Sequence, residues 1–406
     1  SLSWRELFTD PKLQALIETG LQNNTDLNIA RLKVTEAEAT LMTSRLAYLP
    51  SISFEPSGTL RSVDGNAMTK SYDIAASASW EVDIFGKLTN AKRGAKAALE
   101  QSEAYRQAVQ TQLIATIANS YYSLLMLDAQ LDISERTAAI WGENVRAMKA
   151  LKAAGDATEL AVAQSEASKL SVDASIASLR QQIDQMENTL TALLGIAPQK
   201  IDRTTIGEQR FPTELAAGVP LQLLQRRPDV RQSEAALAQA FYATNAARAA
   251  FYPSITLSGS AGWTNAAGAA ITNPGQWLFT AVGSLVQPLF NRGKNIANLR
   301  IAKAQQEEAL LSFRQSLLDA GTDVNNALIQ WQTARQRQQI DQQQILSLES
   351  TVRSSELLMQ YSSQNYLEVL TARQTLLQAE LTAVSDRFDE IQGVINLYHA
   401  LGGGAE

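Results

Sequence analysis

The sequence of 406 residues contains no cysteine and a single histidine, His399. The absence of cysteine excludes disulfide bonds, thiolate catalysis and zinc sites built from cysteine. His399 follows Tyr398 near a predicted helix end, and no nucleophile motif accompanies it, so we interpret it as a structural residue. We therefore expect no enzymatic activity, no cofactor and no metal site.

Proline and long apolar runs are also scarce. No proline occurs between Ser57 and Ala197 or after Pro288, which argues against several compact globular domains. The sequence has no run of roughly 20 apolar residues, so it encodes no transmembrane helix. The net charge of −6 comes from 35 basic and 41 acidic residues without a basic block, which argues against a nucleic-acid partner.

Two stretches without proline predict very long helices. Residues 87–154 and 294–361 each span about 68 residues, which corresponds to roughly 100 Å as one α-helix. A strict seven-residue apolar repeat faces a neighbouring helix only when the helices supercoil left-handedly, so we predict coiled-coil packing. The ladder in the second stretch consists of Leu310, Leu317, Val324, Trp331, Gln338, Ile345, Val352 and Met359, and Ile117, Leu124 and Leu131 repeat it in the first.

The two halves of the chain repeat each other, which indicates a tandem duplication. Residues 45–52 return as 248–255, and Leu194-Gly195 returns as Leu401-Gly402. Each half predicts a rod of helices with a β-hairpin at one end and a helix turn at the other. We divide the chain into an N-terminal arm 1–25, a first repeat 26–195 (helices 26–48, 87–154 and 157–194, hairpin 51–85), a linker 196–228, a second repeat 229–401 (helices 229–251, 294–361 and 364–401, hairpin 254–290) and a tail 402–406.

The hairpin segments alternate with period two, as strands with one apolar face do. The opposite face carries small polar residues, namely Ser77, Ser79, Thr256, Ser258, Ser260, Thr280 and Ser284. Such strands alone are typical of one half of a soluble sandwich. Four strands leave two open edges and an exposed apolar face, however, and their union with long duplicated helices favours a closed membrane barrel around a polar lumen.

The number of strands bears on the oligomeric state. Two chains would supply eight strands, about enough for a filled barrel, and three would supply twelve, which begins to leave a hole. Aromatic residues near the strand ends are expected at the membrane interface, because amphipathic rings favour that depth. These are Tyr72, Trp80, Trp263 and Trp277.

Several motifs carry a resemblance to a known family. They are Trp4 to Leu13, Asn24 to Leu27, Val82-Asp-Ile-Phe-Gly86, Gly218-Val-Pro-Leu with Arg226 to Arg231, and Asn365 to Leu370. Together they resemble the TolC-like outer-membrane factors over nearly the whole chain. The motifs at Val82 and Arg226 resemble in particular the NodT-type lipoproteins that serve RND efflux pumps.

The resemblance implies an α+β membrane protein in the outer membrane of a Gram-negative bacterium, with most of its mass in the periplasm. As a homotrimer it would form a 12-stranded β-barrel continuous with a 12-helix periplasmic α-barrel, with an equatorial belt built from the termini and residues 196–228. Many relatives are lipidated on an N-terminal cysteine. This chain has none, so we expect an anchor upstream of Ser1 or no anchor.

The resemblance also places a gate at the periplasmic helix ends. Leu367 matches an apolar constriction and Glu368 an acidic ring, whereas Thr371 occupies a position that is often aspartate, which argues against a double acidic ring. Leu367 also begins a stripe with Leu370 and Leu377, so ordinary helix packing is the alternative interpretation. The expected gate residues are Leu367, Glu368, Thr371, Leu160 and Gln164.

The helix turns at the same end are the expected docking site for a periplasmic adaptor. In the resemblance, Gly155 matches a tip glycine of the first repeat, and the turn of the second repeat is shorter and lacks glycine. The expected docking residues are Gly155, Asp156, Ser363 and Gln364.

These observations predict a passive exit duct for drugs or other small toxic compounds. Transport would be driven by an inner-membrane RND transporter that reaches the duct through a periplasmic adaptor, a membrane fusion protein. The alternatives are a duct for type I protein secretion and, from another class, a soluble coiled-coil scaffold.

Overall fold

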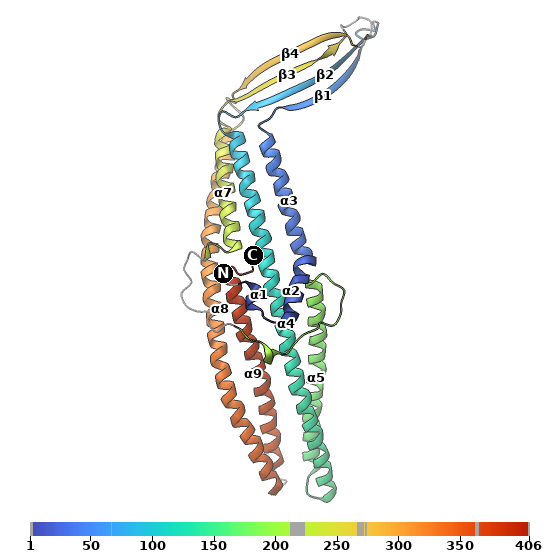
Figure 1. Ribbon diagram of the computed structural model, residues 1–406, viewed down its shortest axis with the longest axis vertical. Helices are drawn as coiled ribbons and strands as arrows, with labels where there is room; N and C mark the ends of the chain where they lie inside the picture. The colour runs from blue at the N-terminus through green and yellow to red at the C-terminus, as the bar shows by residue number, and fades with distance from the viewer. Residues whose placement is uncertain are drawn as a thin grey trace. The chain divides into compact units, whose positions relative to one another are not determined.

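The computed structural model describes residues 3–65, 67–211, 224–265, 272, 274–361 and 365–404, and Figure 1 labels their helices and strands. Contacts divide the chain into two compact units that cut across the sequence repeats. One unit comprises residues 1–30, 106–228 and 317–406, and the other comprises 31–105 and 229–316. The long helices α4 (Lys87–Ala154) and α8 (Lys294–Tyr361) contribute residues to both units, and each has the 68 residues that the sequence predicts.

The unit with residues 229–316 contains an antiparallel sheet of strand order β1-β2-β3-β4. Its strands are β1 (Ser51–Arg61), β2 (Thr69–Val82), β3 (Ser254–Thr264) and β4 (Gln276–Val286). Pro56 is tolerated in β1 because β1 is an edge strand. The same unit contains most of α3 (Thr25–Leu46) and α7 (Pro228–Ala249).

The register of the sheet separates its two faces as the alternation predicts. Ser77 pairs with Ser53 and Ser260, so small polar residues lie across neighbouring strands. Trp263 pairs with Ile74 on one side and Trp277 on the other, which aligns the apolar face. Leu278 and Val282 of β4 are exceptions, because their pairing with Gly262 and Ser258 places them on the polar face.

The other unit contains α1 (Trp4–Leu7), α2 (Pro11–Asn23), α5 (Glu159–Leu193), the 3-10 helix η1 (Ile206–Glu208) and α9 (Tyr366–Ala400). Its core encloses the N-terminal arm. Leu7, Phe8 and Ile17 are fully buried against Tyr121 and Tyr122 of α4. The ladder residues of α8 are all buried or half-buried, in agreement with coiled-coil packing.

A buried carboxylate, Asp10, fixes the arm to two other segments. Its Oδ2 accepts hydrogen bonds from Tyr121 Oη of α4 at 2.7 Å, from Gln209 Nε2 at 3.1 Å and from Thr204 Oγ1. Its Oδ1 caps α2 by accepting from the Lys12 amide at 2.9 Å. Burial raises the pKa of Asp10, but these hydrogen bonds outweigh burial and hold it below its usual value.

Helix ends meet in both halves through side-chain caps. Asn24 Oδ1 accepts from the Leu27 amide at the start of α3, while its Nδ2 donates to Leu193 O at the end of α5. In the second half the motif residue Arg227, which precedes α7, donates to Ala400 O at the end of α9 and pairs with Asp323 of α8 at 2.8 Å. The Arg226 motif therefore has a structural role, because a buried guanidinium satisfies a helix C-terminus and a carboxylate together.

Candidate functional site

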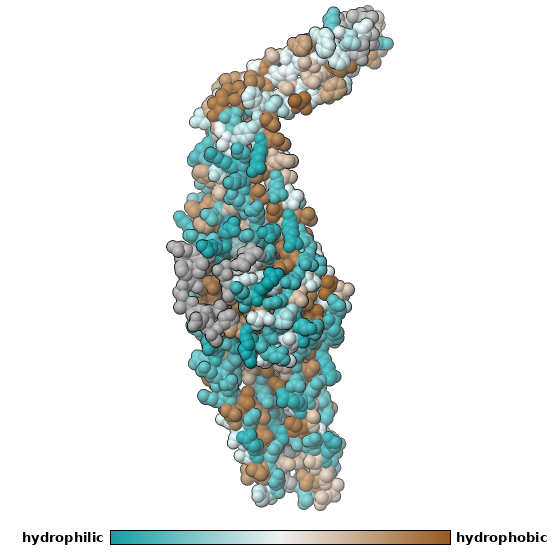
Figure 2. Space-filling model, viewed as in Figure 1, coloured by the Kyte–Doolittle hydropathy of each residue, from teal (hydrophilic) through white to brown (hydrophobic). Residues whose placement is uncertain are grey.

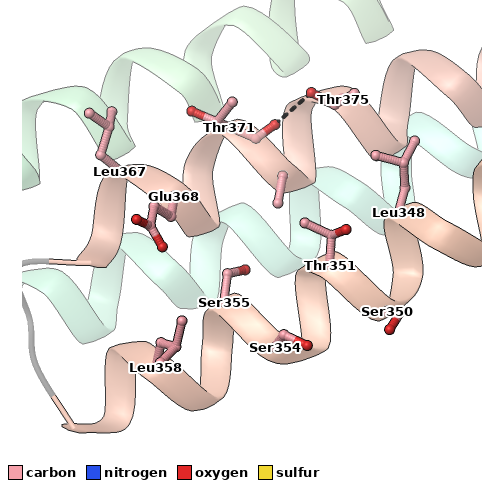
Figure 3. Close-up of a pocket in the computed structure, with 11 residues that line it drawn as sticks. Leu348, Ser350, Thr351, Ser354, Ser355, Leu358, Leu367, Glu368, Thr371 and Thr375 are labelled. Carbon is pink, nitrogen blue, oxygen red and sulfur yellow. Dashed lines mark hydrogen bonds between the residues drawn. The ribbon is translucent and has the colours of Figure 1, made fainter.

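A groove between the ends of α8 and α9 contains three of the expected gate residues. It encloses about 680 Å³. Leu367, Glu368 and Thr371 line it from α9 (Figure 3). Three serines and Thr351 face them from α8, together with Leu348 and Leu358. The groove therefore combines an apolar residue, a carboxylate and a polar wall within one helical hairpin.

The packing alternative for Leu367 can now be judged from burial. Leu370 is 7% exposed and packs against Trp141 of α4, with Leu377 beside the same cluster. Leu367 is 54% exposed and lies on the groove wall. Leu370 and Leu377 thus belong to the packed interface between α9 and α4, and Leu367 lies outside this interface.

The first repeat supplies two hydrogen bonds to this region. Gln164 Oε1 of α5 accepts a hydrogen bond from Tyr366 Oη at the start of α9, at 2.7 Å. About two turns further along α9, Gln374 Nε2 donates to Ser168 Oγ of α5 at 3.0 Å. Leu160 is 61% exposed and does not line the groove, whereas Gln164 is hydrogen-bonded to α9.

Tyr366 is a residue that sequence reasoning did not assign to the gate. The signal was present in the Asn365 motif, where Tyr366 opens the helix that carries Leu367 and Glu368. Only the contact with Gln164, 202 residues away, identifies it as a link between the two helical hairpins.

An ion pair closes the α8–α9 hairpin beside the groove. Arg373 of α9 pairs with Glu356 of α8, and both side chains are partly buried. Partial burial reduces screening by solvent, so this pair contributes more to holding the hairpin than a fully exposed pair would. Helix α9 is therefore held to α8 by an ion pair and to α5 by two hydrogen bonds.

The turn of the first repeat has the geometry of a glycine C-cap. Gly155 has φ +87°, and its amide donates to Lys152 O at 3.0 Å, while the Asp156 amide donates to Leu151 O at 2.8 Å. This is the left-handed conformation that favours glycine after a helix. Both residues are exposed. Ser363 and Gln364 lie outside the described residues.

The expected interface aromatics lie at two levels of the sheet. Tyr72, Trp263 and Trp277 are near the end that adjoins the strand-connecting turns, and the rings of Trp263 and Trp277 are 5.5 Å apart in a T-shaped arrangement. Trp80 lies near the other end, where its Nε1 donates to Tyr48 O at 2.9 Å. Tyr72 and Trp80 are eight residues apart, about 26 Å along a strand, which at the tilt of outer-membrane barrel strands is about 20 Å of height and approaches the height of their apolar band of about 25 Å.

Exposed apolar side chains also occur on β4 and directly after it. Phe279 is 74% exposed, and Leu289 and Phe290, which follow β4, are 93% and 85% exposed. Figure 2 shows hydrophobic residues gathered at the end of the sheet that adjoins the helices. There Phe85 and Tyr252 stack with ring centroids 5.0 Å apart. A continuous exposed apolar surface of this kind marks contact with a membrane or a partner.

Among the described residues, no helix combines the length and apolarity needed to cross a membrane.

A two-faced sheet joined in duplicate to long helical hairpins defines the class of this protein, a channel component of the bacterial outer membrane. The family model for outer membrane efflux proteins matches residues 16–196 and 219–403. The chain belongs to the outer membrane efflux protein family, in agreement with the resemblance carried by its motifs.

Relatives from several efflux systems are similar over nearly the full length of the chain. The cation efflux system protein CusC of Escherichia coli O6:H1 is 30% identical over 407 residues, which cover 99% of this chain and 88% of CusC. The pyoverdine export outer membrane protein OpmQ of Pseudomonas putida is 31% identical over 415 residues, with the same coverage. The solved open state of the MtrE outer membrane channel of Neisseria gonorrhoeae matches with a TM-score of 0.91 at 29% identity, covering 100% of this chain and 92% of that one.

The chain is thus an outer-membrane component of an efflux system, located in the outer membrane of a Gram-negative bacterium.

Proposed function

We propose that three copies of this chain form the exit duct of a tripartite RND-type efflux pump. The observation that carries this proposal is the separation of an exposed apolar face of the sheet from a face of mainly small polar residues, with Leu278 and Val282 of β4 as exceptions. Strands β1 and β4 are the sheet edges of one chain, and edges do not persist in hydrocarbon. Closure of twelve strands would pair every edge and enclose a water-filled lumen.

In this duct, the apolar face contacts lipid, with Trp80 at one membrane interface and Tyr72, Trp263 and Trp277 at the other. Amphipathic rings favour these two depths. The periplasmic adaptor would dock at the helix turns around Gly155 and Asp156, and the inner-membrane RND transporter would supply the driving force.

The substrates that we propose are drugs or other small toxic compounds. Relatives carry names as different as cation efflux and pyoverdine export, which supports a duct that selects little by itself. A lumen of serine and threonine side chains offers weak, general hydrogen bonding, so the choice of substrate falls to the pump.

The gate of the duct is assigned to the α8–α9 groove. Three copies of Leu367 would form an apolar constriction, and three copies of Glu368 would form a ring of like charge that attracts cations. The hydrogen bond from Tyr366 to Gln164 would hold α9 against α5 in the narrow state.

The test is single-channel conductance in planar bilayers. Replacing both Leu367 and Glu368 with alanine should raise the conductance several-fold, because the constriction would lose its bulk and its charge. Leu170→Ala is the matched control, since Leu170 is similarly exposed on α5 but does not line the groove. Equal conductance of the double variant and the wild type would remove these residues from the gate, and failure to insert would contradict the membrane assignment.

A further inference from the structure

A pair of buried carboxylates faces across the seam between α8 and α9. Asp341 of α8 is 7% exposed and Asp386 of α9 is 1% exposed. The two side chains lie within hydrogen-bonding reach of each other when one of them carries a proton. Asp341 Oδ2 has no hydrogen-bond partner among the described residues, and the only partner of Asp386 Oδ1 among them is the guanidinium of Arg337. Two carboxylates in this position cannot both ionise without a large cost.

The charged groups around Asp341 and Asp386 do not neutralise the negative charge of two ionised carboxylates. Arg337 of α8 forms an ion pair with Asp386 and also lies 3.5 Å from Asp389 of α9. The other nearby cations, Arg335 and Arg387, both pair with Glu390 of α9, which also accepts a hydrogen bond from Gln338.

The third packed helix, α4, meets this part of α9 through Gln130, whose amide donates to Leu381 O and Ser385 Oγ. One to two turns away, burial raises the pKa of Glu380 of α9, Arg136 of α4 lowers it and Glu349 of α8 raises it. Arg337 thus lies against two carboxylates, Asp386 and Asp389, while Asp341 lies beside Asp386. A single proton shared by the buried pair would replace repulsion with a hydrogen bond.

The ionisation of Asp386 responds to mild acid. Burial raises the pKa of Asp386, and the hydrogen bond and negative charge of Asp341 raise it further, to about 6, against the opposing effect of Arg337. Asp386 thus takes up a proton between neutral and weakly acidic pH, and that proton can be donated in a hydrogen bond to Asp341.

The first repeat provides an internal comparison. The corresponding helices begin 207 residues apart, at Lys87 and Lys294 and at Glu159 and Tyr366. At this displacement Asp341 corresponds to Ser134, Asp386 to Leu179 and Arg337 to Gln130, so the first repeat has no carboxylate at either position of the pair. The carboxylate pair belongs only to the hairpin that carries Leu367 and Glu368.

We propose that Asp341 and Asp386 form a proton-dependent clamp on the α8–α9 seam, which tightens when the pair binds one proton and loosens when both carboxylates ionise. The effect has a definite sign. A carboxylate with a raised pKa in the packed state stabilises packing as the pH falls through that pKa, and the gain levels off near the unfolded pKa of about 3.9. Local opening of the seam should thus be on the order of tenfold rarer at pH 5 than at pH 7.5.

Amide hydrogen exchange on the purified protein tests the clamp directly. Protection of peptides covering residues 335–345 and 380–392, corrected for the intrinsic exchange rate at each pH, should rise about tenfold from pH 7.5 to pH 5. Asp386→Asn should give high protection at both pH values, because the neutral amide can donate to Asp341 as the protonated acid does.

Two further variants complete the design. The double variant Asp341→Ser with Asp386→Leu introduces the residue types that the first repeat has at these positions, Ser134 and Leu179. Its protection from exchange should also be independent of pH. This variant keeps the test valid if Asp386→Asn fails to fold. Asp389→Asn removes a carboxylate of the same cluster that lies outside the buried pair, and it should retain most of the pH dependence, because Asp389 is the weakest of the groups that raise the pKa of Asp386. Unchanged wild-type protection between the two pH values, or the same pH dependence in Asp386→Asn, would overturn the clamp.

The link to conduction rests on the proposed function and is measured separately. If the α8–α9 hairpin is the gate, the open probability of wild-type channels in planar bilayers should be lower at pH 5 than at pH 7.5, and this difference should vanish in Asp386→Asn. A pH-dependent protection without a pH-dependent open probability would keep the clamp and reject the gate assignment of the hairpin.

Discussion

At the scale of single residues, Asp10 joins three segments that are distant in the sequence. Its carboxylate accepts hydrogen bonds from Tyr121, Thr204 and Gln209 and caps α2. Burial raises the pKa of Tyr121 well above its ordinary value, and the negative charge of Asp10 raises it as well, so its hydroxyl remains a donor at every physiological pH. The packing of the arm therefore depends on the ionised carboxylate of Asp10, which accepts hydrogen bonds from all four of these groups.

We predict that Asp10→Asn lowers the free energy of unfolding by about 1–3 kcal/mol at pH 7, since the amide cannot accept the same set of bonds. The folded pKa of Asp10 lies below its unfolded value, so its stabilising contribution is present above about pH 4 and is lost as the pH falls through the folded pKa. The difference in stability between the wild type and Asp10→Asn should therefore be smaller at pH 3 than at pH 7. Thermal unfolding of both proteins in detergent at the two pH values measures this difference.

Asp202→Asn is the control for that measurement. Asp202 pairs with Lys12 at the surface, where its side chain is 76% exposed. Exposed ion pairs contribute little, so the change should stay within about 0.5 kcal/mol. A loss as large as that of Asp10→Asn would contradict the importance assigned to burial.

At the scale of elements, the α8–α9 seam combines close helix contact with a charged cluster. Gly393 of α9 approaches the backbone of α8 so closely that an added Cβ would lie 2.9 Å from Trp331 Cα and N. Backbone cannot rotate away as a side chain can, so glycine is required for this spacing. The position is continuous with the core that contains Ile391, Val394 and Ile395.

Gly393→Ala should therefore separate α8 from α9 and lower the free energy of unfolding by about 1–3 kcal/mol. Gly321→Ala in α8 is the matched comparison, because no atom lies within 4 Å of its added Cβ. There the higher helix propensity of alanine should stabilise the protein by up to about 1 kcal/mol. Chemical denaturation of the two variants measures the change in the free energy of unfolding, which should be negative for Gly393→Ala and positive for Gly321→Ala. Equal changes would contradict the close contact at Gly393.

At the scale of the whole molecule, the sheet edges set the requirement for assembly. Each chain offers β1 and β4 as unpaired edges and an apolar face with Phe54 and Phe279 exposed. Hydrogen-bonding groups at an open edge cost several kcal/mol each in hydrocarbon, so closure with other copies is required for insertion. The proposed duct therefore exists only as an oligomer.

We predict that the protein in detergent has the mass of three 44.2 kDa chains and that the oligomer resists dissociation in SDS before heating. Light scattering with correction for bound detergent measures the mass. A dimer would give eight strands and a filled barrel, which is incompatible with a duct. A monodisperse monomer in plain buffer would contradict the membrane assignment itself.

The sequence by itself determined the elements and their faces. The absence of proline from 87–154 and 294–361 allowed two uninterrupted helices, and the seven-residue ladder identified the buried stripe of α8. The period-two alternation fixed which side of each strand is apolar. These features are local, because helix and strand periodicities repeat within a few residues and need no knowledge of distant partners.

Only the tertiary structure decided which of these residues meet. Leu367 and Leu370 look equivalent in the apolar stripe, yet burial places Leu370 in the seam and Leu367 on the groove. Tyr366 donates a hydrogen bond to Gln164, which is 202 residues away in the sequence. Asp341 and Asp386 lie beside each other on two antiparallel helices. Such pairs depend on helix rotation and register, which many weak contacts set together, so no single segment of the sequence records them.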